Sequence, residues 1–183
     1  TVALVAKRTS GKAFMSTDGN RIAFESWAQE VVPGFVDHNG DHQNLFVRDM
    51  AVGANKLVDG HDSSPTDGVN EYSDLMGMSA DGNTVLFQTP APDVLTSFTD
   101  GNGDGMDLYV RSLTQPRPFL VTGVDGSHQL GANGENGLRN PSDAKLTADG
   151  RRVFFNSDST NLNQAFTVPL HEHQVWTREL ADY

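Results

Sequence analysis

Met15-Ser16-Thr17-Asp18-Gly19 is the stretch that decides the fold, because the chain repeats it as Met78-Ser79-Ala80-Asp81-Gly82 and as Leu146-Thr147-Ala148-Asp149-Gly150. Successive copies begin 63 and 68 residues apart. Aligned without a gap, residues 15–49 and 78–112 share 16 identities in 35 positions. A fixed period of this length indicates a protein assembled from one repeated supersecondary unit.

Each copy predicts a small antiparallel sheet. A short apolar segment enters the Asp-Gly turn and a strand leaves it, which is a strong hairpin signal because Asp and Gly tolerate the backbone angles of tight turns. Helical periodicity is not sustained anywhere in the chain. The sequence therefore predicts an all-β fold with four antiparallel strands per repeat. The strands expected after the apolar lead-in are residues 22–25, 85–88 and 153–156, then 45–48, 108–111 and 175–178, and finally 56–58 and 119–121.

The second copy carries a recognisable motif series. Ser79-Ala80-Asp81-Gly82 is followed by an apolar strand containing Phe87, then by Asp100-Gly101-Asn102-Gly103, then by Asp107-Leu108-Tyr109-Val110-Arg111. This series resembles the WD40-like (PD40) repeat of TolB-type β-propeller proteins, and the resemblance runs through all three copies. It implies that each repeat is a propeller blade. For function it implies binding, because such propellers mostly bind other molecules and some only cap another domain.

The repeats organise residues 1–183 as a single propeller-like domain. We assign residues 1–14 to a closing strand and lead-in, 15–77 to repeat 1, 78–145 to repeat 2, and 146–183 to a repeat 3 that lacks its last strand. Three blades are too few for a closed ring, since propellers typically use four to eight. We therefore expect a partial propeller that is completed by a second copy of the chain, by the rest of a larger propeller, or by a capping partner.

The composition of the chain argues against several classes of partner and of catalytic chemistry. The net charge is −11, with 13 Lys and Arg against 24 Asp and Glu, which argues against nucleic acid and anionic lipid as main partners because both demand a basic surface. The chain has no cysteine, so thiolate catalysis and Cys-ligated metals are excluded. No run of residues is long and apolar enough to span a bilayer, and we expect a signal peptide to be either absent or already removed. We expect an extracytoplasmic bacterial protein, periplasmic or secreted.

Two acidic loops are candidate calcium sites. Hard cations need several oxygen ligands, and the segment 100–107 places oxygen side chains at alternate positions. It lacks the closing glutamate of an EF-hand, because Arg111 stands there, and turn chemistry alone explains an Asp-x-Asn-Gly sequence equally well. The candidate ligands are Asp100, Asn102, Asp104 and Asp107 in the second repeat, and Asp37, Asn39 and Asp41 in the first.

One charged position recurs in the strand that follows each loop. Arg48, Arg111 and Arg178 occupy it, and a position that repeats is most simply a contact between repeats. We expect each arginine to pair with a carboxylate of its own or the next blade, with the turn residues Asp18, Asp81 and Asp149 as candidates. The polar stretches 59–73 and 123–142 connect the copies, either as simple links or as part of a binding surface.

No catalytic motif is present. The chain lacks a Gly-x-Ser-x-Gly elbow, a His-Glu-x-x-His motif, a P-loop and a dinucleotide fingerprint. The leading hypothesis is a non-catalytic protein-binding or scaffold module, an accessory subunit of a larger assembly. The alternatives are a calcium-dependent carbohydrate or cell-surface binder, and a fragment of a propeller enzyme with its catalytic residues elsewhere.

Overall fold

The computed structural model describes residues 9–134, 144–166, 168–169 and 172–180. In these residues the regular structure is three antiparallel β-sheets and one short 3-10 turn, Val124–Gly126 (η1). The all-β class expected from the repeats is thereby confirmed. Within the same residues no helix has the length and hydropathy needed to cross a membrane.

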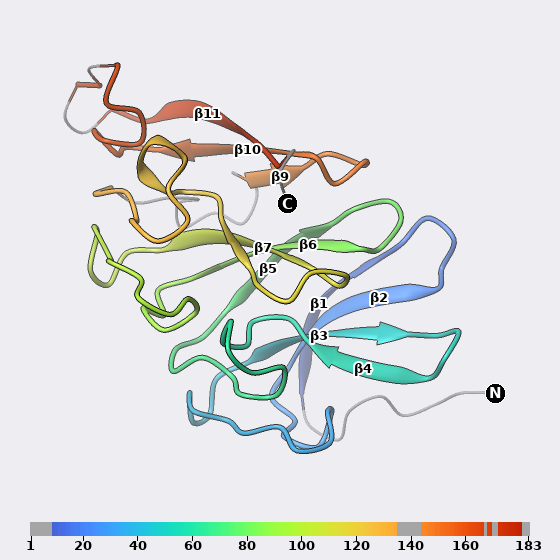
Figure 1. The fold of residues 1–183 in the computed structure, drawn as a ribbon. Coiled ribbons are helices and arrows are strands. Elements are labelled where there is room, and N and C mark those ends of the chain that lie inside the picture. The colour runs from blue at the N-terminus through green and yellow to red at the C-terminus, as the bar shows by residue number, and fades with distance from the viewer. Residues whose placement is uncertain (1–8, 135–143, 167, 170–171, 181–183) are drawn as a thin grey trace.

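The three sheets follow one another along the chain, and sheet 2 lies between sheets 1 and 3 (Figure 1). Every sheet is a simple meander, in which each strand pairs with the next strand in sequence. Sheet 1 consists of β1 (Ser10–Met15), β2 (Arg21–Ser26), β3 (Asn44–Asp49) and β4 (Ala54–Leu57); sheet 2 of β5 (Asp74–Met78), β6 (Thr84–Thr89), β7 (Asp107–Ser112) and β8 (Phe119–Leu120); and sheet 3 of β9 (Ala144–Leu146), β10 (Arg152–Ser157) and β11 (Gln174–Glu179).

Strand alternation gives each sheet two faces. We call the face that carries Phe24 in sheet 1, Phe87 in sheet 2 and Phe155 in sheet 3 the front, and the opposite face the back. Each Phe pairs across the front with an aromatic residue of the next strand: Phe46, Tyr109 and Trp176 respectively. The fronts are therefore built from the same residue types at the same register.

The core consists of fronts packed on backs. The front of sheet 2 and the back of sheet 1 share one buried cluster, and the front of sheet 3 and the back of sheet 2 share another. Burying these aliphatic and aromatic side chains is the main force that holds consecutive sheets together. The first cluster includes Val85, Phe87 and Tyr109 with Ala23, Leu45 and Val47; the second includes Val153 and Phe155 with Leu86, Leu108 and Val110.

All eight strands expected after the apolar lead-ins are present. Sheets 1 and 2 begin with the strand before the Asp-Gly turn. The predicted repeat units 15–77 and 78–145 begin at the end of that strand, so each sheet starts a few residues earlier than its repeat unit. Among the described residues sheet 3 has three strands. The closing strand expected near the start of residues 1–14 lies in 1–8, outside the described residues, and β1 overlaps only the lead-in that follows it.

Candidate protein-binding faces at the ends of the sheet stack

The Ser/Thr-x-Asp-Gly motif forms a self-contained turn. In the first copy the Ser16 hydroxyl donates to Asp18 Oδ1 at 2.6 Å, and the main-chain N–H of Asn20 donates to the same oxygen at 3.0 Å. The hydroxyl hydrogen bond contributes most to lowering the pKa of Asp18 to about 2. Ser79 with Asp81 and Thr147 with Asp149 repeat the 2.6 Å contact, and the pKa of both aspartates is lowered.

Successive turns are joined by main-chain hydrogen bonds. The N–H of Thr17 donates to the carbonyl of Ala80 at 2.8 Å, and the N–H of Ala80 donates to the carbonyl of Ala148 at 2.8 Å. The three residues occupy the same place in their turns. Each sheet is therefore tied to the next at its turn end by the same contact.

A second repeated contact joins the third strand of one sheet to the residues that follow the fourth strand of the preceding sheet. Arg111 Nε donates to the carbonyl of Val58 at 2.9 Å, and its Nη2 donates to the carbonyl of Gly60. Arg178 does the same one sheet later, with Nε 3.0 Å from the carbonyl of Val121 and Nη2 2.6 Å from that of Gly123. In both cases β7 or β11 holds the arginine, and its acceptors lie just after the fourth strand of the preceding sheet. We call residues 58–60 and 121–123 the exit segments.

At these two interfaces the hydrogen bonds described for Arg111 and Arg178 run to main-chain carbonyls, and the pairing with a turn carboxylate stays a prediction. The turn carboxylates are already held by the hydroxyl and main chain of their own turns. The planar guanidinium spans two carbonyl oxygens whose residues lie two positions apart in the chain. Burial lowers the pKa of Arg178, but such a group stays protonated in the physiological range.

Arg48 departs from this pattern. It occupies the same position in β3, yet its Nη1 donates to the carbonyl of Gly53 at 2.6 Å and to Asn55 Oδ1 at 3.4 Å, both in its own hairpin. Its Nε is buried and has no hydrogen-bond partner in the part of the chain that the structure describes. In the described part of the chain, Arg48 of sheet 1 thus has no exit segment like those that Arg111 and Arg178 bind.

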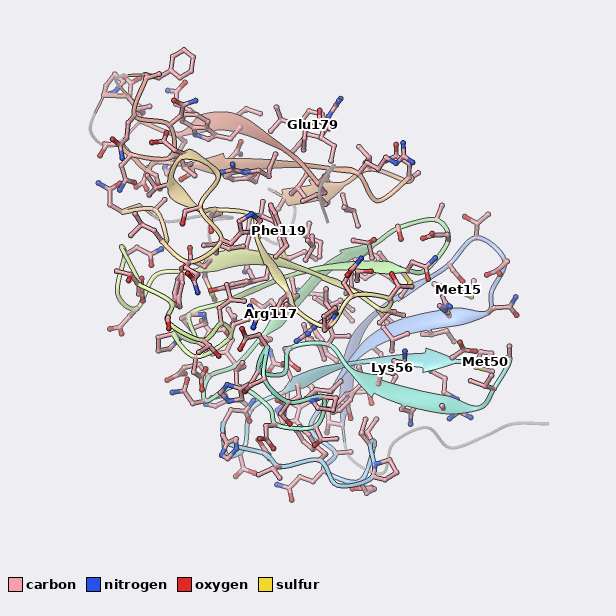
Figure 2. All side chains as sticks on the ribbon, viewed as in Figure 1. Met15, Met50, Lys56, Arg117, Phe119 and Glu179 are labelled. Atoms are coloured by element: carbon pink, nitrogen blue, oxygen red, sulfur yellow. The ribbon has the colours of Figure 1, made fainter. Side chains whose placement is uncertain are left out.

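The front of sheet 1 is partly open. Its row of Phe24, Phe46 and Leu57 is covered by the loop that follows β2, through Val31, Val32 and their neighbours. The adjacent row runs Met15–Ile22–Arg48–Asn55 across the four strands. Met15, the β1 residue of this row, is 65% exposed (Figure 2). Its equivalents Met78 and Leu146 pack against the buried clusters.

The back of sheet 3 is exposed and mixed in character: beside an ion pair between Arg152 and Glu179 it carries two apolar side chains. Phe154 and Val175 are 41% and 77% exposed there. Their equivalents in sheet 2, Leu86 and Leu108, are fully buried against sheet 3. The described stack therefore ends on one partly open front and one exposed back, and each presents apolar side chains whose equivalents are packed in sheet 2.

In each acidic loop a carboxylate oxygen accepts hydrogen bonds from main-chain N–H groups of its own turn. Asp100 Oδ1 accepts the N–H groups of Asn102 and Gly103 at 2.9 and 3.0 Å, and Asp37 Oδ1 accepts that of Asn39 at 3.1 Å. Asp107 lies in β7 and accepts the Thr122 hydroxyl at 2.7 Å, which places its Oδ1 in the sheet and not in the loop. Asp41 and Asp104 are exposed.

Two amide oxygens in these loops are buried without a partner. Asn39 and Asn102 each donate through Nδ2 to main-chain carbonyls, but the Oδ1 of each accepts no hydrogen bond. A buried orphan acceptor is uncommon. Among the described side chains, however, no three His, Asp or Glu residues gather closely enough to hold a metal ion.

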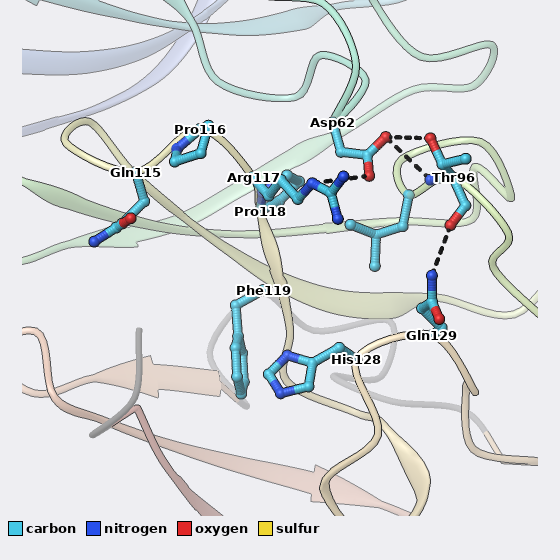
Figure 3. Close-up of a pocket in the computed structure, with 10 residues that line it drawn as sticks. Asp62, Thr96, Gln115, Pro116, Arg117, Pro118, Phe119, His128 and Gln129 are labelled. Atoms are coloured by element: carbon cyan, nitrogen blue, oxygen red, sulfur yellow. Dashed lines mark hydrogen bonds and ion pairs between the residues drawn. The ribbon is translucent and has the colours of Figure 1, made fainter.

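A cavity of about 500 Å³ opens where the link after sheet 1 meets sheet 2 (Figure 3). Asp62 Oδ1 accepts both the N–H and the hydroxyl of Thr96, at 3.0 and 2.6 Å, and the carbonyl of Thr96 accepts Gln129 Nε2 at 3.0 Å. Phe119 and His128 meet edge to face with ring centroids 4.7 Å apart. Asp62, Thr96 and Gln129 are thus joined by hydrogen bonds at the wall of the cavity.

Asp59 is a buried acid that the sequence reasoning missed. Its side chain is fully buried within the first exit segment, where Oδ1 accepts the N–H of Leu45 at 3.0 Å. Removal from water raises its pKa to about 7, despite this hydrogen bond and the charge of Arg111. The equivalent residue is Thr122, a neutral group, so no repeated carboxylate pointed to the site.

No family model matches this sequence, and no curated protein matches it either. The site is therefore interpreted from its own geometry.

Proposed function

We propose that this chain is a non-catalytic protein-binding and scaffold module built on a partial β-propeller of the WD40-like (PD40), TolB type. In this proposal it acts as an accessory subunit of a larger extracytoplasmic assembly in a bacterium. Three consecutive meander sheets joined by the same contacts support the blade assignment. The location rests on the resemblance to TolB-type repeats.

The observation that carries the proposal is the back of sheet 3. Two apolar positions that are fully buried in sheet 2, at Leu86 and Leu108, are exposed to solvent in sheet 3, where Phe154 and Val175 occupy them. Exposed apolar area costs about 25 cal/mol per Å², so a protein partner that covers this face gains the same kind of energy that binds the sheets to each other. The partner is a second copy of the chain or another polypeptide.

The test is sedimentation velocity over a concentration series with two matched variants. Val175→Glu places a charge on the back of sheet 3, and Val52→Glu places one at a similarly exposed site in the turn between β3 and β4. We expect the wild type and Val52→Glu to form species heavier than 19.8 kDa, and Val175→Glu to remain monomeric. Equal association of the two variants would show that the back of sheet 3 is not the binding face.

A wild-type chain that stays monomeric assigns the face to a different polypeptide. In that case the same pair of variants is compared in the co-purified complex. Loss of the complex with Val175→Glu but not with Val52→Glu is the expected result.

A second candidate function is calcium-dependent binding of carbohydrate or a cell surface. It is favoured by the unpartnered Oδ1 atoms of Asn39 and Asn102 in loops that also carry carboxylates. Titration calorimetry with CaCl₂ tests it, with Asp104→Ala as the variant. We expect measurable heat in the wild type and a weaker affinity in the variant, with unchanged stability in chelator. An affinity unaffected by Asp104→Ala would contradict this candidate.

A further inference from the structure

The arginine contacts between sheets share one geometry. Each arginine donates through Nε to the first carbonyl of an exit segment and through Nη2 to the carbonyl two residues later. The acceptors are Val58 and Gly60 in one interface and Val121 and Gly123 in the other, 63 residues apart in both cases. The contact is therefore a property of the repeat and not of one pair of sheets.

The arginine lies beside the apolar core of the interface. The front of sheet 2 meets the back of sheet 1 through fully buried residues such as Phe87 and Leu45, and Arg111 itself is only 8% exposed. A charge removed from water in this way is retained only if its donors are satisfied. Arg111 meets that condition with the carbonyls of Val58, Gly60 and Pro116.

Arg48 is the one repeat arginine that does not meet this condition in the described structure. Its Nε is buried without a partner, and its Nη1 turns back onto the β3–β4 hairpin. Beside it the open row of the front exposes Met15, whose equivalents are packed in the other sheets. Both a polar and an apolar feature of the interface are thus left uncovered at the same place.

We propose that the front of sheet 1 docks a further sheet of this same repeat, and that Arg48 binds the two main-chain carbonyls of its exit segment. This inference rests on the proposed binding function and names the class of partner. The partner is a four-stranded meander with an aliphatic back, like that of sheets 1 and 2, whose fourth strand continues into a Val-x-Gly exit. On docking, the guanidinium of Arg48 leaves its hairpin and takes the position that Arg111 and Arg178 already have.

The test supplies such a sheet in a known position. A copy of residues 11–73 is inserted directly before Gly11, which preserves the 63-residue period and places a Val58-Asp59-Gly60 exit ahead of sheet 1. The product contains two versions of Arg48 in identical local sequence. The downstream Arg48 has an exit segment to bind, and the upstream Arg48 has none, so each is the matched control for the other.

Arg48→Met is made at each position in turn, and the unfolding equilibrium is measured in urea. At the downstream position we expect the equilibrium to shift toward the unfolded state at least about tenfold, comparable with Arg111→Met, because charged hydrogen bonds are lost. At the upstream position, and in the original chain, we expect a change of less than about threefold. Equal effects at the two positions, or a silent downstream substitution, would overturn the proposal.

A measurement without substitution covers the case in which a variant does not fold. In ¹⁵N spectra of the duplicated chain, the Nε–Hε signal of the downstream Arg48 is expected to exchange slowly with solvent, as that of Arg111 does. Rapid exchange at that signal would contradict the proposal. The result is independent of the sedimentation experiment, because the added sheet is covalently attached and no self-association is needed.

Discussion

At the residue scale, the glycines of the Asp-Gly turns carry out two separable tasks. Gly19, Gly82 and Gly150 all have φ near +70°, which any side chain makes unfavourable. Only Gly82 and Gly150 also lie against the turn of the preceding sheet. A Cβ on Gly82 would come within 2.8 Å of Arg21 Cβ and 2.9 Å of Ser16 Cβ, whereas one on Gly19 has only Met15 Sδ within 4 Å, at 3.9 Å.

We therefore expect Gly82→Ala to destabilise the fold by about 2–3 kcal/mol and Gly19→Ala by about 1 kcal/mol. The excess at Gly82 measures the close approach of the two turns, because the backbone strain is common to both variants. Urea denaturation of the two proteins provides the comparison. Equal losses would mean that the turns can separate at little cost.

Asp59 makes stability depend on pH. Its folded pKa of about 7 exceeds the ordinary value of 3.8, so the folded state holds the proton more tightly than the unfolded chain. The resulting stabilisation is fully present below about pH 4 and is lost as pH rises through 7, by an amount on the order of 4 kcal/mol.

Asp59→Asn removes this dependence because the amide does not titrate. We expect the wild type to lose thermal stability between pH 5 and pH 8, and the variant to follow a flatter curve over the same range. Calorimetric melting at several pH values tests the difference in slope, whatever the amide costs in absolute stability. Parallel curves would place the titration elsewhere.

At the element scale, the strands were predictable and their contacts were not. Alternating apolar residues around Asp-Gly mark β2, β6 and β10, because hairpin chemistry is local in sequence. The partner of Arg111 could not be found in the same way. Its acceptors are main-chain carbonyls, which every residue carries. The side-chain types at Val58 and Gly60 therefore do not indicate the contact. The openness of Phe154 and Val175 likewise depends on what covers sheet 3, which its own strands do not encode.

The geometry of the arginine contact predicts that lysine cannot replace Arg111. Arg111→Met is expected to cost about 2–4 kcal/mol, since it leaves the carbonyls of Val58 and Gly60 without their donors. Arg111→Lys should recover less than half of that loss, because an ammonium group cannot span two carbonyls as a planar fork does. Urea midpoints of the three proteins test this, and full rescue by lysine would show that charge alone is needed.

At the scale of the whole molecule, the stack behaves as a linear array in which each sheet touches only its neighbours. Sheet 2 is packed on both faces, whereas sheets 1 and 3 are each packed against another sheet on one face. In such arrays the terminal units open more readily than the central one. Native-state hydrogen exchange should therefore show the slowest amides in β6 and β7 and faster exchange in β10 and β11. Uniform protection would indicate a single cooperative unit.

The contact of Arg111 and Arg178 with backbone carbonyls also bears on how such a protein evolves. The side chain between the two acceptors is Asp59 in one interface and Thr122 in the other, and the contact is the same. Because the arginine binds main-chain carbonyls, the contact tolerates mutation of the side chains in the acceptor segment. For the same reason it does not distinguish one repeat from another. When repeats are gained, lost or reordered by recombination, each new junction therefore keeps this hydrogen-bond contact without a compensating substitution in the acceptor segment.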